Sequence, residues 1–249
     1  MLCNLPKHNT TYTIQIQTLK YLLYRVVLSG YQLLDTGRLH PLRERAIRAL
    51  SSSVDYIDLH MPQAIGFDSQ KELIDFALEQ ARASGHYLEF GVFSGGTIRH
   101  IARRKRAAVI HGFDSFEGLP EPWSGFTLGQ RVFSRGGHLP RVPANVVLHK
   151  GWFKDTVPQW CRETDGPIAF IHIDCDLYSS TVDILTGLAQ RLQRGTVILF
   201  DEYFNYPGWE RHEYKAWQEF VKAEHIQYEY VAYARQQVMV RIAGIGSTQ

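Results

Sequence analysis

The chain has 249 residues, of which 45% are hydrophobic and 21% charged, and its formal net charge is +2. These values are typical of a soluble globular protein with one domain or two small ones. The near-neutral charge gives no indication of a nucleic-acid partner. Three scattered cysteines exclude a disulfide-stabilised scaffold and fit a reducing compartment, so we expect a cytoplasmic protein.

Residues 13–34 place apolar side chains on one helical face. The apolar stretch 21–34 is interrupted by Arg25 and Gln32 and is too short to span a bilayer. No signal-peptide pattern is expected, and no stable membrane insertion. Two placements stay open for this helix. The first is packing against the domain or against a second subunit, and the latter would give a homo-oligomer through the N-terminal helices. The second is peripheral contact with a membrane.

A second short helix is expected at 41–50, followed by an irregular stretch at 51–68. Together, residues 1–65 read as an N-terminal helical extension. Residues 66–249 are expected to form one domain that opens with a helix from about 68 to 83. Its apolar positions recur as a core-facing stripe.

From residue 86 the sequence alternates between short apolar runs and amphipathic stretches. Strands are expected at 86–91, 107–113, 145–149, 168–174 and 196–201, helices at 95–104, 155–162, 179–192 and 209–223, and a final strand pair at 226–233 and 237–242. Repeated strand–helix units indicate a parallel sheet with helices on both faces. We therefore predict an α/β fold: a Rossmann-like, doubly wound, mostly parallel seven-stranded sheet with an antiparallel edge hairpin.

A glycine-containing turn joins the first strand to the next helix. Gly91, Gly95 and Gly96 are spaced G-x-x-x-G-G, and Phe93 stands where a dinucleotide fingerprint has its middle glycine. A phenylalanine there obstructs a pyrophosphate, so the turn fits a nucleoside ligand such as S-adenosylmethionine better. Glu89 is then expected to face its ammonium group, directly or through water. The alternative is a plain strand–helix turn.

Two further segments fit the same ligand. Asp114 ends the second strand. At its sequence separation from the glycine turn, an acid commonly accepts hydrogen bonds from ribose hydroxyls. The alternative is an ordinary helix-capping or loop acid. Trp152 and Phe153 follow Gly151 after the third strand, where either ring can stack on an adenine or pack into the core.

Carboxylates follow two apolar runs. Asp174 ends the fourth strand, and Asp201 and Glu202 end the fifth. If the strands are adjacent, these acids meet at the cofactor mouth and repel one another unless a cation such as Mg²⁺ is bound. Helix caps and solvated loop acids are the alternative, and Asp176 can replace Asp174.

A general base is harder to place. His172 is expected to be a hydrogen-bonded core histidine rather than part of the site. His212 and His138 lie in segments that should border the mouth.

Four ordered segments resemble the macrocin O-methyltransferase family, which comprises metal-assisted class I enzymes that use S-adenosylmethionine. They are 112–120, 151–158, 172–181 and 200–203, and the likeness runs from about 86 to 242. The resemblance implies Mg²⁺ bound by Asp174, Asp201 and Glu202. The cofactor site is expected to comprise Glu89, Phe90, Gly91, Val92, Gly95, Asp114, Ser115, Phe116, Gly151, Trp152 and Asp174.

The sequence departs from that family at two points. The macrolide-modifying members have two aspartates where this chain has Asp201 and Glu202, and residues 203–209 are unlike theirs. The acceptor therefore need not be a macrolide sugar. We expect an O-methyltransferase acting on a hydroxyl of a sugar or polyhydroxylated small molecule, with Asp174 and His212 as catalytic candidates. A non-catalytic cofactor-binding module and an oxidoreductase are the alternatives.

A run of basic residues and a long loop are two further features of the sequence. A basic run falls at an expected helix C-terminus, where the helix dipole favours cations, and it comprises Arg99, Arg103, Arg104, Lys105 and Arg106. Nucleic-acid binding is the less favoured interpretation. The long loop 117–143 contains Trp123, Phe126, Arg131, Phe133, Arg135 and His138. A loop of this length is expected to form a substrate lid, or else to contact a second subunit.

Overall fold

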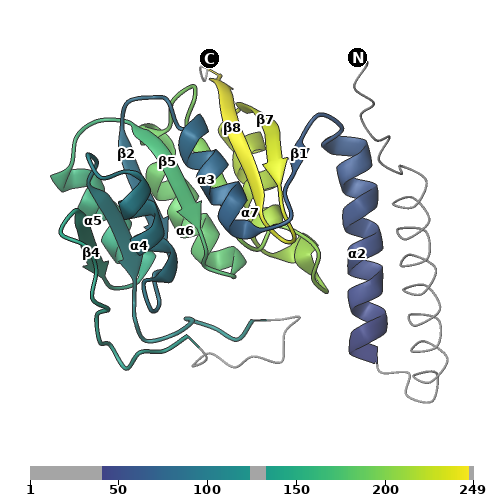
Figure 1. Ribbon diagram of the computed structural model, residues 1–249, viewed down its shortest axis with the longest axis horizontal. Helices are drawn as coiled ribbons and strands as arrows, with labels where there is room; N and C mark the ends of the chain where they lie inside the picture. The colour runs from purple at the N-terminus through teal and green to yellow at the C-terminus, as the bar shows by residue number, and fades with distance from the viewer. Residues whose placement is uncertain (1–40, 124–132, 247–249) are drawn as a thin grey trace, which may run out of the picture. The chain divides into compact units, whose positions relative to one another are not determined.

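The computed structural model describes residues 41–123 and 133–246 (Figure 1). The expected helix at 13–34 and its two possible placements lie outside these residues, as do Phe126 and Arg131. The compact unit is Arg45–Gln249, and of the unit that precedes it only residues 41–44 are described. The expected domain boundary at 65/66 stays a prediction.

The first described element, α2 (Pro41–His60), is longer than expected. The prediction of an irregular chain at 51–60 was wrong. Serines at 51–53 suggested a break, but the hydroxyls of Ser52 and Ser53 donate to the carbonyl of Ala49, at 3.1 and 2.7 Å. This back-bonding satisfies each hydroxyl within the helix, so the serines do not end it.

One mixed sheet forms the centre of the unit. Its strands are β1 (Ile65–Gly66), β2 (His86–Phe90), β3 (Ile110–Asp114), β4 (Val146–Lys150), β5 (Ile168–Ile173), β6 (Val197–Phe200), β7 (Ile226–Tyr233) and β8 (Val238–Ile245). They lie in the order β1-β7-β8-β6-β5-β2-β3-β4. β8 is antiparallel to both its neighbours, and the other pairs are parallel. The predicted α/β, doubly wound, mostly parallel fold is confirmed.

The strand count differs from the prediction by one. β1 pairs with β7 beyond the hairpin, so the sheet has eight strands rather than seven and the β7–β8 hairpin is not its edge. A strand of two residues is too short to show the alternation on which strand prediction depends.

Helices cover both faces of the sheet. They are α3 (Gln70–Gln80), α4 (Gly96–Arg104), α5 (Phe153–Glu163), α6 (Tyr178–Leu188) and α7 (Glu213–Ala223), with 3₁₀ turns at Ala189–Arg191 and Trp209–Arg211. Alternate strand residues point to opposite faces. Phe170 packs with α3 and α4, whereas Ile171 packs with α5, α6 and α7.

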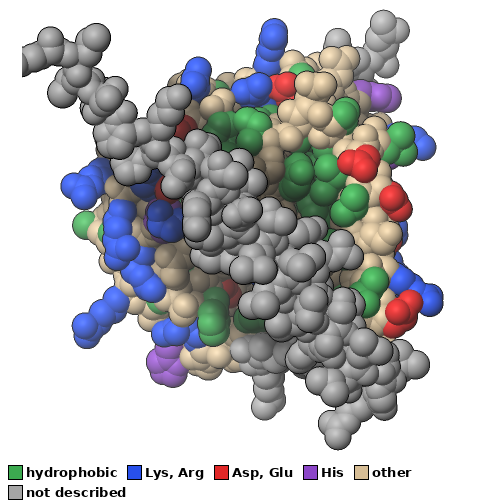
Figure 2. Space-filling model, turned by 45° about the vertical axis from the view of Figure 1, so that its right-hand side comes forward, with side chains coloured by type: hydrophobic (Ala, Val, Ile, Leu, Met, Phe, Trp, Pro, Cys, Tyr) green, Lys and Arg blue, Asp and Glu red, His purple; other side chains and the backbone are tan. Residues whose placement is uncertain are grey.

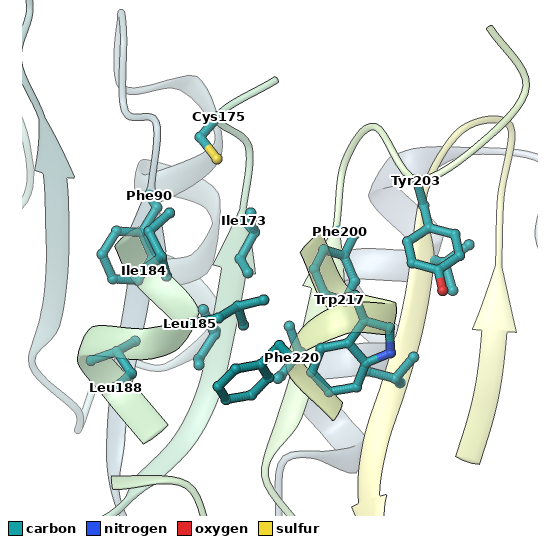
Figure 3. Close-up of a cluster of buried hydrophobic side chains, with 14 of the residues drawn as sticks. Phe90, Ile173, Cys175, Ile184, Leu185, Leu188, Phe200, Tyr203, Trp217 and Phe220 are labelled. Atoms are coloured by element: carbon teal, nitrogen blue, oxygen red, sulfur yellow. The ribbon is translucent and has the colours of Figure 1, made fainter. Parts of the chain in front are cut away.

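The face covered by α6 and α7 holds the largest buried side chains. Figure 3 shows Ile173 of β5 and Phe200 of β6 next to Leu185 of α6 and Trp217 of α7. All four are almost inaccessible to solvent. These contacts fix β5 and β6 side by side, and the two strands end at Ile173 and Phe200, directly before Asp174 and Asp201.

The basic run lies at the end of α4, as expected, with Arg103 and Arg104 in its last turn. Arg104 pairs with Asp75 and Glu79 at 3.1 Å each. On the face shown in Figure 2, Lys and Arg side chains gather mostly on one side. Within the two described ranges, no helix combines the length and apolarity needed to cross a bilayer.

Strand register brings three turns to one edge of the sheet. Phe90 lies opposite Ile173, and Ile173 opposite Phe200. The N–H of Asp174 donates to the carbonyl of Phe90 and the N–H of Asp201 to that of Ile173, both at 2.8 Å. The two strands that are followed by carboxylates, β5 and β6, are therefore neighbours, as predicted.

A histidine pair on β3 and β4 gives the fold a pH dependence. Nδ1 of His111 lies 3.0 Å from Nε2 of His149. Burial, with His149 and His86 nearby, lowers the pKa of His111 to about 4. An unfolded histidine titrates at about 6.5. Between these values the unfolded chain binds more protons, so stability is lost as pH falls from about 6.5 towards 4.

We expect His111→Phe, which keeps a ring beside Trp160, to reduce this loss. Urea unfolding of the wild type and the variant at pH 4.5 and 7 measures it. An equal drop in the free energy of unfolding in both proteins would show that His111 does not contribute.

Candidate functional site

A cavity of about 760 Å³ lies at the carboxyl ends of β2, β3, β5 and β6. Ligands of open α/β sheets bind at this edge. Of the residues predicted for the cofactor, seven line the cavity: Gly91, Val92, Asp114, Ser115, Gly151, Trp152 and Asp174. The other four, Glu89, Phe90, Gly95 and Phe116, are buried behind its wall.

The turn after β2 requires glycine at its first position. Gly91 has φ +94°, and a Cβ there would overlap the carbonyl oxygen of Asp174. The absence of a side chain lets the turns after β2 and β5 touch. Phe93, at φ +44°, lies against the ring of Phe133 with centroids 5.8 Å apart, and both line the cavity.

Asp114 organises this turn from the end of β3. One carboxylate oxygen accepts the N–H groups of Val92 and Phe93 at 2.9 and 2.6 Å, and the other accepts that of Phe116 at 2.6 Å. A carboxylate has about four acceptor positions, so it retains capacity for a ligand hydroxyl. Asp114 lines the cavity, and its predicted ribose contact stays a prediction.

Glu89 does not face the cavity directly. Its Oε1 lies 3.1 Å from Nδ1 of His172, and both side chains are fully buried. The other His172 nitrogen is 3.5 Å from Oδ1 of Asp201. Burial alone would lower the pKa of His172, but hydrogen bonds to Asp201 and Glu89 raise it well above its usual value. His172 is thus a bonded core histidine, as expected, and it links Glu89 to the acids.

The predicted acids meet at the mouth together with Asp176. Asp174 lies with His172 and Asp201 in one group of potential ligand atoms, and with Asp176 and Glu202 in another, with all atoms of each group within 4.8 Å. Asp176 has φ +65°, a left-handed conformation that aspartate tolerates better than most residues. Asp176 therefore joins the cluster and does not replace Asp174.

These carboxylates perturb one another. Burial and the Asp201 charge raise the pKa of Asp174 and of Glu202 well above the usual range, and raise that of Asp176 to about 7. Burial also acts on Asp201, but hydrogen bonds to His172, Glu202 and Gln70 outweigh it and lower its pKa. One anion in the cluster is thus stabilised by protein groups, and the others lack a counter-charge.

Two side chains that the sequence did not single out complete the site. Nε2 of Gln70, in the first turn of α3, donates to Oδ1 of Asp201. Glu213, buried at the start of α7, accepts the N–H of Cys175 at 3.4 Å and that of Glu202 at 3.1 Å. Glu213 therefore ties the turn after β5 to the turn after β6. The sequence contains one local indication of the position of Gln70, because the N-cap residue Ser69 fixes where α3 begins.

The two histidines considered as bases lie outside the cavity lining. His212 is buried at the N-cap of α7, with its ring 6.4 Å from Trp123 and 6.1 Å from Tyr206. Trp123 lines the cavity, whereas His212 does not. His138 is exposed. A catalytic role for His212 stays a prediction, and so does the lid role of loop 117–143.

Residues 88–203 match the family described as a methyltransferase domain. The predicted resemblance is confirmed, and the matched segment spans the glycine turn, Asp114 and the acid cluster.

Curated relatives are natural-product O-methyltransferases. The chain is 33% identical over 141 residues to 8-demethyl-8-(2,3-dimethoxy-alpha-L-rhamnosyl)-tetracenomycin-C 4'-O-methyltransferase of Streptomyces olivaceus, covering 48% of this chain and 53% of that one. It is 32% identical over 147 residues to mycinamicin III 3''-O-methyltransferase of Micromonospora griseorubida, covering 48% and 55%. The chain spans about half the length of the curated relatives it matches.

A solved calicheamicin methyltransferase has the same fold. Its TM-score is 0.58 at 21% identity, over 82% of this chain and 94% of that one.

Gly91→Ala tests the contact between the turns after β2 and β5. A left-handed alanine costs about 1–2 kcal/mol, and its Cβ would also displace Asp174. We expect a lower melting temperature. In Gly96→Ala, the matched control, no heavy atom lies within 4 Å of the new Cβ, so stability should hold or rise. Equal melting temperatures for wild type and Gly91→Ala would contradict this geometry.

Glu213→Ala tests the link between the two acidic turns. It leaves the N–H groups of Cys175 and Glu202 without their acceptor, at a cost of about 1–3 kcal/mol each. We expect a lower free energy of unfolding and weaker Mg²⁺ binding, measured by denaturation and calorimetry. Glu210→Ala, in the exposed turn before α7, is the control. Wild-type Mg²⁺ affinity in Glu213→Ala would show that the link does not shape the acids.

Proposed function

We propose that this protein is an S-adenosylmethionine-dependent O-methyltransferase, assisted by a divalent cation, that acts on a hydroxyl of a sugar or polyhydroxylated small molecule. One observation carries the proposal: a cluster of buried and half-buried carboxylates borders the nucleoside-sized cavity of a methyltransferase domain. The relative from Streptomyces olivaceus is named for 4'-O-methylation of a rhamnosyl compound, which supports a sugar hydroxyl as acceptor.

The cavity has the chemistry that the methyl donor requires. Asp114 offers a free acceptor position for a ribose hydroxyl, and the rings of Phe93, Phe133 and Trp152 supply flat apolar walls for an adenine. Phe153 also lines the cavity, but its ring packs edge-on against Phe90 with centroids 5.4 Å apart. This leaves Trp152 as the better adenine neighbour of the two.

The acids fit a hard divalent cation. They offer carboxylate oxygens, the ligands that Mg²⁺ prefers, and Oε2 of Glu202 is buried with no hydrogen-bond partner among the described residues. Asp174, Asp201 and Glu202 would hold the ion, with Asp176 beside them. Mg²⁺ bound there would neutralise the cluster and favour the ionised form of an acceptor hydroxyl.

The chain's own residues prepare the rest of the reaction. The His172 imidazolium, held by Glu89, keeps Asp201 ionised and oriented. Asp176 lines the cavity, where its carboxylate can take up a proton from an acceptor hydroxyl. Methyl transfer is an in-line displacement, so alignment of donor and acceptor in this enclosed space supplies much of the rate.

Thermal unfolding with S-adenosylhomocysteine tests the proposal. A ligand at about 100 times its Kd adds about 2.7 kcal/mol, which for a chain of this size raises the melting temperature by roughly 5–10 °C. We expect Mg²⁺ to increase the shift in the wild type and in Asp165→Asn, an exposed control. Asp174→Asn should lose that increment and most of the methyl transfer. No shift with S-adenosylhomocysteine would contradict the proposed function.

A further inference from the structure

A second cavity of about 530 Å³ adjoins the first. All its lining residues are polar: Asp68, Ser69, Gln70, Asp201, Asn205, Arg235, Gln236 and Gln237. Gln70 and Asp201 also line the first cavity, so the two spaces meet at this hydrogen-bonded pair. A ligand in the second cavity would therefore reach one of the acids assigned to the cation.

Three segments far apart in the sequence build this cavity, and hydrogen bonds hold them together. The segments are the entry to α3, the chain after β6 and the turn between β7 and β8. Nδ2 of Asn205 donates to the carbonyl of Arg235 at 2.8 Å, and the N–H of Tyr203 donates to the carbonyl of Gln236 at 3.0 Å. The turn closes on itself, because the N–H of Ala234 donates to the carbonyl of Gln237 at 3.0 Å. The cavity is thus a built feature of the fold.

We infer that the second cavity is the acceptor subsite and that it binds a hydroxyl-rich, non-aromatic group such as a sugar ring. This inference rests on the proposed function. Carboxamide side chains present both donors and acceptors, as sugar hydroxyls require, and four of them line the space. The lining has no aromatic or aliphatic side chain against which a phenol ring would pack.

The first cavity is less suited to that group. Its walls include Phe93, Phe133, Trp152 and Leu119, which favour a flat apolar ligand, and the nucleoside is assigned there. The methyl donor is then assigned to the first cavity and the acceptor ring to the second, with the reacting hydroxyl at the junction that Gln70 and Asp201 line. Gln70, which already donates to Asp201, is then the positioning residue between them.

Arg235 and Gln236 are the lining residues best suited to a test. The Arg235 side chain is exposed and makes no hydrogen bond or ion pair with any residue of 41–123 or 133–246. The Gln236 amide makes only a 3.5 Å contact, to the carbonyl of Asn205. Neither side chain supports the fold, so their removal should affect a bound acceptor and little else.

The experiment measures binding of methyl α-L-rhamnoside by saturation-transfer NMR, with S-adenosylhomocysteine and Mg²⁺ present. We expect binding to the wild type and to Arg106→Ala, an exposed arginine near the end of α4. Arg235→Ala combined with Gln236→Ala should bind the rhamnoside about tenfold more weakly, since two hydrogen bonds are lost. Affinity for S-adenosylhomocysteine should be equal in all three proteins.

The outcomes separate the two claims. Absence of S-adenosylhomocysteine binding by the wild type would overturn the proposed function itself. If that ligand binds but the rhamnoside does not, or binds the double variant as well as the wild type, the second cavity is not the acceptor subsite. Displacement of the rhamnoside by catechol, a flat aromatic diol, would also overturn the inference.

Discussion

The repulsion among buried carboxylates at one edge of the sheet is the constraint on which the site depends. Six acids lie there: Glu89, Asp174, Asp176, Asp201, Glu202 and Glu213. The His172 imidazolium interacts with three of them, Asp201, Glu89 and Asp174. One positive charge cannot balance them, and burial alone raises the pKa of most of them. The fold thus holds a local charge imbalance, which protons offset in the free protein and which a divalent cation would offset better.

The surrounding structure keeps these acids in place. Gly91 lets the turn after β2 touch Asp174, Glu213 bonds the two acidic turns to α7, and Gln70 brings the first turn of α3 to Asp201. Beneath them, Ile173 and Phe200 anchor the strand ends in the core (Figure 3). An apolar core fixes the strands, and backbone hydrogen bonds then aim the charged groups above it.

Features that depend on neighbouring residues could be predicted from the sequence, whereas features that depend on contacts between distant segments could not. Asp174 and Asp201 end periodic apolar runs, so local pattern and the rules of parallel sheets placed them at one edge. Helix α2 continues through Ser52 and Ser53 because their hydroxyls bond back to the helix backbone. Strand β1 exists because it pairs with β7. Neither interaction leaves a local sequence pattern from which the element could be predicted. Gln70 and Glu213 enter the site from helices distant in sequence. Asp176 joins it through a left-handed backbone, which propensity does not indicate.

Mn²⁺, a spectroscopic substitute for Mg²⁺, can test directly whether these carboxylates share one divalent cation. Electron paramagnetic resonance counts free Mn²⁺ as the protein is titrated. We expect one bound Mn²⁺ per chain, displaced by Mg²⁺ and lost in Asp201→Asn. Absence of Mn²⁺ binding, or equal binding by wild type and Asp201→Asn, would contradict it.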